Sequence, residues 1–171
     1  MVNRRNRNLI VTAAAVAALC AQAGADTFAF SANINGAQEV PASTSLALGF
    51  LAGVYDSDVQ SFSFSWLITD NLTGTPSAPG AHIHMGAVGV AGPILFGFSS
   101  GSWNLSGSAL WENMTTSEVD ALFAGDLYVN FHTDAFPSGE VRGQITRVVP
   151  TPGTLGLVGV GMLMCGTRRR R

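Results

Sequence analysis

Large apolar side chains occupy every second position of Ser61-Phe62-Ser63-Phe64-Ser65-Trp66-Leu67-Ile68. Successive side chains of a β-strand point to opposite faces of the sheet, so the aromatic residues share one face and the serines the other. The stretch therefore predicts a strand with a buried aromatic face and a solvent-exposed, hydroxyl-rich face.

The same period of two recurs through residues 26–148. Apolar residues alternate with others in residues 28–34, 46–54, 94–98, 103–105, 127–131 and 141–145. Turn-forming sequences such as Asn35-Gly36 and Pro79-Gly80 separate these runs. Many short strands with turns between them predict one antiparallel all-β domain, either a sandwich or a Greek-key barrel.

One segment has a helical pattern instead. Thr115-Thr116-Ser117-Glu118 is a capping box, in which the first threonine and the glutamate satisfy each other's backbone N–H groups. Val119, Leu122 and Phe123 follow at helical spacing, and Gly125 is a typical residue at the end of a helix. We expect one short helix between two strands.

Residues 1–25 have the three parts of a signal peptide. A basic start is followed by a short apolar run over residues 9–19 and by the small residues Ala23-Gly24-Ala25. Signal peptidase would therefore cleave after Ala25. A retained membrane helix is the alternative, but the run is shorter than the roughly 20 residues that span a bilayer. A lipoprotein signal at Cys20 is disfavoured because the bulky Leu19 precedes it.

Residues 149–171 form a second targeting segment. Pro150, Thr151 and Pro152 begin an extended linker, residues 154–166 are apolar and glycine-rich, and the chain ends in Arg168, Arg169, Arg170 and Arg171. An apolar helix followed by arginines is typical of a membrane segment with its basic end in the cytoplasm. This order resembles PEP-CTERM sorting tails, with Pro-Thr-Pro in place of Pro-Glu-Pro. The resemblance implies processing by an exosortase-like transpeptidase, and a plain membrane anchor is the alternative.

Charge excludes one class of partner for the central domain. Residues 26–149 contain all 11 acidic residues but only Arg142 and Arg147, a balance of 2 − 11 = −9. Affinity for nucleic acids depends on basic residues, so we expect no nucleic-acid binding. The domain also has no cysteine, which excludes a cysteine-based metal site.

The three histidines of the chain are the strongest candidates for a metal site. His82 and His84 are two positions apart, so on a strand they would point to the same face. His132 follows the predicted strand 127–131 and would complete a cluster if the two strands were neighbours. Imidazole nitrogens suit copper or zinc. The alternative is that these histidines only bond to loop carbonyls and fix turns.

Glu140 and Arg142 form a second polar pair at strand spacing. Two residues apart on a strand, they could form an ion pair, which contributes little to stability if it is exposed. Glu140 could instead accept a hydrogen bond from the ring N–H of a metal-ligating histidine.

Four motifs carry a resemblance to a known family. They are Gly36-Ala37-Gln38-Glu39-Val40-Pro41, Ala81-His82-Ile83-His84 with Gly89-Val90-Ala91-Gly92-Pro93, Gly125-Asp126-Leu127-Tyr128-Val129-Asn130 with His132-Thr133, and Gly139-Glu140-Val141-Arg142-Gly143-Gln144. In this order they resemble the CHRD domain, named after chordin and also found in bacterial secreted proteins. The resemblance implies an immunoglobulin-like antiparallel β-sandwich over about residues 28–147, with targeting helices on either side.

The sequence is compatible with two functions. The first is a non-catalytic module without a cofactor, exported to the cell surface, outer envelope or extracellular matrix, where it meets a surface or matrix partner. The second is a secreted protein that binds one copper or zinc ion through His82, His84 and His132 and has a redox role. A copper–zinc superoxide dismutase needs six histidines and an aspartate, so three histidines exclude that two-metal enzyme.

Overall fold

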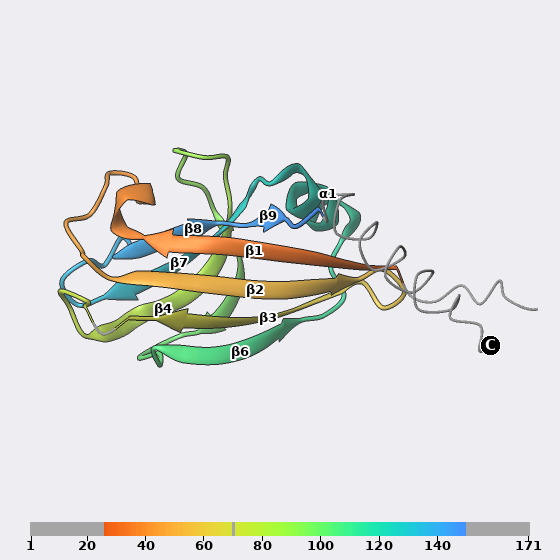
Figure 1. Ribbon diagram of the computed structural model, residues 1–171. Helices are drawn as coiled ribbons and strands as arrows, with labels where there is room; N and C mark the ends of the chain where they lie inside the picture. Colours follow the sequence, from red (N-terminus) through yellow and green to blue (C-terminus); the bar gives the residue numbers. More distant parts are fainter. Residues whose placement is uncertain (1–25, 70, 150–171) are drawn as a thin grey trace, which may run out of the picture.

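The computed structural model describes residues 26–69 and 71–149, which form nine β-strands, one α-helix and one turn of 3₁₀-helix (Figure 1). In that part of the chain no helix is long and apolar enough to cross a membrane. The elements are, in order, β1 (Thr27–Asn35), η1 (Gly36–Gln38), β2 (Leu48–Asp56), β3 (Ser61–Ile68), β4 (Pro76–Met85), β5 (Ile94–Ser99), β6 (Ser106–Trp111), α1 (Thr116–Ala124), β7 (Leu127–Thr133), β8 (Val141–Gln144) and β9 (Thr146–Arg147).

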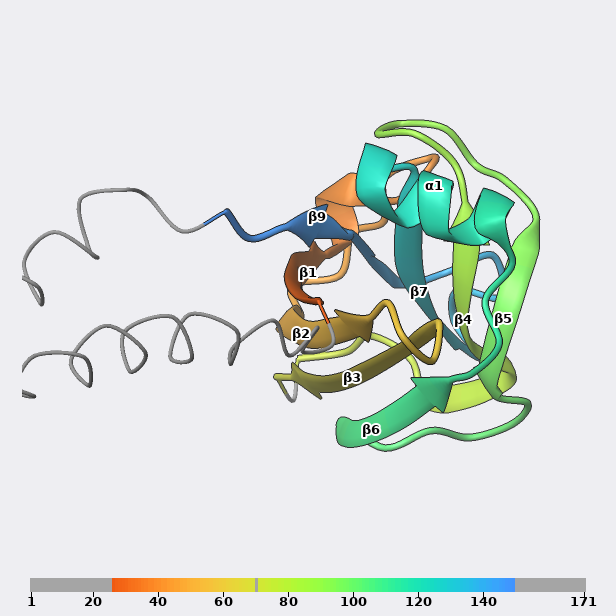
Figure 2. The ribbon, with the colours of Figure 1, turned by 90° about the vertical axis from the view of Figure 1, so that its right-hand side faces the viewer.

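All nine strands belong to one antiparallel sheet. Its order is β5-β4-β7-β8-β1-β2-β3-β6, and the short β9 pairs with β1. The sheet curls so that its two edge strands approach each other, giving a nearly closed, barrel-like wall (Figure 2). Phe96 of β5 stacks on Trp111 of β6 with ring centroids 5.1 Å apart, which joins the two edges through side chains.

The alternating stretch at residues 61–68 is strand β3, as predicted. Phe62, Phe64 and Trp66 are buried in the core, whereas Ser63 and Ser65 are exposed. Full burial of a side chain such as that of Phe62 contributes about 1.5–3 kcal/mol to stability. Rings from β1, β5 and β7 surround this aromatic face, so the core lies inside the curled sheet.

Three details of the predicted strands are wrong or incomplete. Pro79-Gly80, predicted as a turn between strands, lies inside β4. Residues 103–105 form no strand but a loop before β6. Trp103 is buried there against Phe131, and its indole N–H donates to the carbonyl of His132 (2.6 Å). The alternation in β2 is confirmed, yet Leu48, Phe50 and Val54 face outward. The inward positions of β2 hold Leu51 and Tyr55 together with glycines.

The predicted helix is confirmed as α1. Thr115 is its N-cap, both hydrogen bonds of the capping box with Glu118 are present, and Gly125 ends the helix in the left-handed region at φ 77°. That backbone conformation favours glycine because a Cβ atom would be strained there.

The antiparallel all-β class is thus confirmed, with one short helix. The strands form one continuous sheet rather than two separate ones, so the sandwich implied by the resemblance is not established. The signal peptide with Ala23 and Ala25, and the sorting motif from Pro150 to Arg171, lie outside the described residues.

Candidate metal centre

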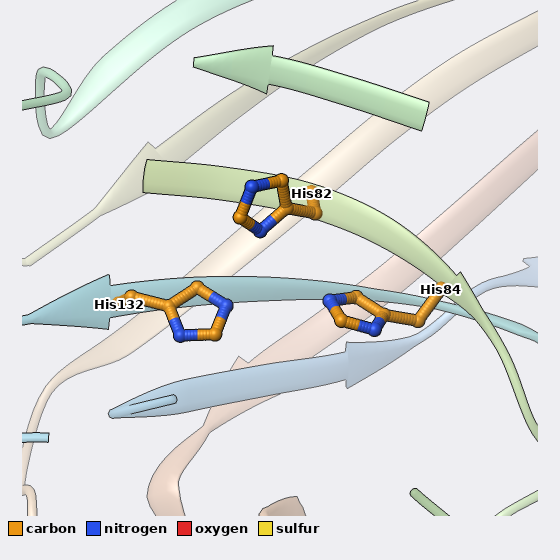
Figure 3. A group of neighbouring side chains, drawn as sticks. All are labelled: His82, His84 and His132. Atoms are coloured by element: carbon orange, nitrogen blue, oxygen red, sulfur yellow. The ribbon is translucent and has the colours of Figure 1, made fainter. Parts of the chain in front are cut away.

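Strands β4 and β7 bring the three histidines together (Figure 3). In their antiparallel register, His82 lies opposite Asn130 and His84 lies opposite Tyr128. His132 is two residues beyond Asn130, so its side chain is on the same face of the sheet. The neighbouring strands that the metal hypothesis required are therefore present.

The histidine cluster is buried and compact. The side chains of His82, His84 and His132 are only 6%, 8% and 4% exposed, and one nitrogen of each lies within 4.8 Å of the others. An ion at the centre of a triangle with 4.8 Å sides would lie about 2.8 Å from each corner. Zinc–imidazole bonds are about 2.0–2.1 Å long, so each ring needs to move inward by at most about 0.7 Å.

Hydrogen bonds fix which nitrogen is free in the rings of His84 and His132. Nδ1 of His84 bonds the carbonyl of Gly92 (3.0 Å) and Nδ1 of His132 bonds that of Pro137 (2.9 Å). A carbonyl only accepts, so both Nδ1 atoms carry the proton and both Nε2 atoms keep a lone pair. Those two Nε2 atoms, and Nδ1 of His82, are buried without any hydrogen-bond partner.

The electrostatics keep all three rings neutral near pH 7. Burial lowers the pKa of His82, and it lowers the pKa of His84 despite the hydrogen bond of that ring to the Gly92 carbonyl. Burial lowers the pKa of His132 to about 4, despite the hydrogen bond to Pro137. Only a neutral imidazole can ligate a metal, so the surroundings favour the ligating form.

Tyr128 and Arg142 hold the loop that borders the cluster. The Tyr128 ring stacks on His84 with centroids 4.9 Å apart, and the guanidinium carbon of Arg142 lies 3.4 Å from the centroid of the same ring. Arg142 donates to the carbonyls of Ala87 and Val90 at 3.0 Å. These bonds anchor residues 86–93, the loop that supplies the carbonyl partner of His84, to the sheet.

Glu140 and Arg142 have separate partners in the described chain instead of pairing with each other. The buried Glu140 carboxylate accepts hydrogen bonds from the Ser45 and Thr133 hydroxyls (both 2.6 Å) and from the backbone N–H groups of Thr73 and Gly74. Burial raises the pKa of Glu140, but these four donors outweigh it and hold the pKa below its usual value. Glu140 thus joins three loops and makes no hydrogen bond to a histidine.

Glu39 and Asn130 are polar residues beside the cluster that were not among the predicted site residues. Both are buried, with the Asn130 side-chain amide 3.5 Å from a Glu39 carboxylate oxygen, and each retains one oxygen without a partner. Burial raises the pKa of Glu39 to about 7, although the charge of Arg142 opposes this. Glu39 lies just beyond η1, and only the pairing of distant strands brings it next to β7.

All five unpartnered buried side-chain atoms of the described residues belong to these five residues, namely Glu39, His82, His84, Asn130 and His132. Buried polar groups are nearly always hydrogen-bonded to protein or to ordered water, so a local concentration of atoms without a protein partner marks this cluster as a candidate site for water or an ion. Three of the five atoms are imidazole nitrogens, a ligand type that suits copper and zinc.

Comparison with known proteins places the chain in a family. The CHRD domain matches residues 30–145, more than half of the 171 residues. The matched region runs from β1 to just after β8 and includes all three histidines. Searches of curated proteins and of solved structures give no match. The chain therefore belongs to the CHRD domain family.

Proposed function

We propose that this chain is an exported CHRD-domain protein whose domain binds one copper or zinc ion through His82, His84 and His132. The observation that carries the proposal is the convergence of three buried imidazole nitrogens that have no other partner. A structural role accounts for the Nδ1 bonds of His84 and His132, but it leaves the free nitrogen of each ring unexplained.

The ligand set favours an ion with a free coordination position. The cluster contains three neutral nitrogen ligands, and among the described residues no carboxylate or cysteine joins them. Three protein ligands plus water are typical of zinc sites that are open to a further ligand, and imidazoles also suit copper. We assign no catalytic step to the domain. A metal-dependent redox role remains the alternative.

Export and sorting are the second part of the proposal. They are supported by the order of basic, apolar and small residues in 1–25 and by the proline, apolar and arginine segments of 149–171. Signal peptidase and an exosortase-like transpeptidase would then be the processing partners, and the domain would act at the cell surface or in the extracellular matrix. The immunoglobulin-like arrangement implied by the family resemblance also belongs to this proposal.

Metal analysis of the purified full-length chain tests the binding site. The chain carries an affinity tag without histidine, is incubated with zinc or copper and is dialysed before elemental mass spectrometry. We expect about one ion per chain, because three preorganised imidazoles retain an ion that isolated surface groups lose. The matched control replaces all three histidines by glutamine, which keeps polar side chains of similar size, and should retain less than about a tenth as much.

Two outcomes would contradict the metal proposal. One is a wild-type chain that is metal-free after loading, and the other is equal metal in the control. Circular dichroism shows whether the control is folded. Should it be unfolded, the single variant His82→Gln replaces it, since His82 is the only one of the three whose Nδ1 is not bonded to a carbonyl.

A further inference from the structure

Strands β1, β2, β3 and β6 present an outer surface on the side of the sheet away from the core. They lie side by side in Figure 1, and their register aligns the outward side chains in three rows that cross the strands. We call this surface the outer serine face. Its rows are Ala29, Val54, Ser63 and Leu110; then Ser31, Ala52, Ser65 and Ser108; and then Asn33, Phe50, Leu67 and Ser106.

The face is a trough of small residues with an apolar ridge along one side and two separate apolar residues along the other. Its middle row contains only serines and an alanine. Phe50 and Leu67, which are 48% and 65% exposed, are neighbours and form one ridge, whereas on the other side Val54 and Leu110 are separated by Ser63. A shallow hollow of about 930 Å³ lies over the face. Isolated exposed apolar residues are ordinary, but the adjacent pair Phe50 and Leu67 beside a hollow that Val54 and Leu110 also line is typical of an interaction surface.

Charge indicates what can bind there. None of the twelve residues in the three rows is charged, although residues 26–149 carry a balance of −9. Two copies of an acidic domain repel each other over most orientations, and a neutral face is where that repulsion is smallest. A charged partner would find no ion-pairing group on this face.

We propose that the outer serine face binds a second copy of this chain in a two-fold dimer. A two-fold axis parallel to the rows seats the Phe50–Leu67 ridge of each copy in the trough of the other. Such an isologous contact uses one surface twice and needs no second partner. The interface lies on β1, β2, β3 and β6, whereas the histidines lie on β4 and β7, so this inference is independent of the metal site.

The size of the face predicts a weak dimer. Strands are about 4.8 Å apart and alternate residues about 6.8 Å apart, so four strands and three rows cover roughly 400 Å² per copy. Stable complexes bury about 800 Å² per partner. We therefore expect the dimer to form where the chain is concentrated, as on a cell surface, and to dissociate on dilution.

Cross-linking in intact producing cells tests the dimer without dilution or detergent. Cys20 and Cys165 are replaced by serine in the full-length chain, and one cysteine is added at Ala52, in the middle row. A short bis-maleimide should link Ala52→Cys chains at least fivefold more than chains with Ser117→Cys, an exposed position on α1. Adding Ser65→Arg to Ala52→Cys should reduce the linked dimer at least fivefold, because it puts two like charges into the neutral trough.

The cross-linked products show which molecule binds to the outer serine face. Equal linking at Ala52→Cys and Ser117→Cys would mean association through another part of the chain and would overturn the proposal. Linking of Ala52→Cys only to other proteins, or no linking at all, would also overturn it. Because Ser65 is exposed, the Ser65→Arg chain should unfold at the wild-type temperature, which separates loss of the dimer from loss of the fold.

Discussion

Replacing Glu140 by alanine is expected to lower the free energy of unfolding by about 3 kcal/mol or more. The substitution removes the acceptor of four hydrogen bonds from Ser45, Thr133, Thr73 and Gly74. It leaves those donors in a site where water has little access, since Glu140 itself is 0% exposed. Denaturant unfolding followed by the fluorescence of the buried tryptophans measures the change.

The control for this prediction is Glu112→Ala. Glu112 is exposed, and surface substitutions of this kind change stability by at most about 0.5 kcal/mol. The Glu140 effect should also depend on pH. A carboxylate whose pKa is lowered by folding stabilises the fold above its unfolded pKa, and this contribution is lost as the pH falls through the folded pKa. Equal stabilities of the two variants at neutral pH would refute the role assigned to Glu140.

Zinc is expected to raise the midpoint of thermal unfolding of the full-length chain by about 10–15 °C at a thousandfold excess over the dissociation constant. An ion that binds only the folded state adds about 4 kcal/mol under that condition. For a domain of this length, each kcal/mol shifts the midpoint by roughly 3–4 °C. Differential scanning calorimetry with and without zinc gives the shift.

The single variant His132→Gln should lose most of this zinc-dependent shift. The free Nε2 of His132 is one of the three converging nitrogens, whereas its Nδ1 bonds Pro137. Magnesium, which prefers oxygen ligands, is the matched ion control and should leave the midpoint unchanged. A zinc shift of the same size in wild type and in His132→Gln would show that zinc binds elsewhere.

Local pattern predicted the helix and most of the strands, but it placed a turn at Pro79-Gly80 inside β4 and did not predict β6. The period of two located β3, and the capping box located α1, because both patterns reflect short-range geometry. The same period could not tell which face of β2 is inside. Leu48, Phe50 and Val54 are the larger apolar residues of the alternating pattern, but they face solvent. The core side of β2 is formed by Leu51 and Tyr55 together with glycines.

The candidate site could be predicted only in part. His82 and His84 share a face because they are two apart on one strand, a local fact. That His132 completes the cluster depends on the pairing of β4 with β7, which are separated by β5, β6 and α1 along the chain. The contact between Glu39 and Asn130 could not be predicted either, because these residues are far apart in the sequence. The same holds for the hydrogen bonds that Glu140 accepts from Thr73 and Ser45 in place of an ion pair with Arg142.

X-ray absorption spectroscopy at the zinc edge tests the central claim most directly. The sample is the full-length chain, with an affinity tag that contains no histidine, loaded with one equivalent of zinc. We expect three imidazole ligands with Zn–N distances of about 2.0–2.1 Å, together with one light scatterer from water. A first shell made of oxygen atoms only, or one with a single imidazole, would contradict the assignment of His82, His84 and His132 as the metal centre.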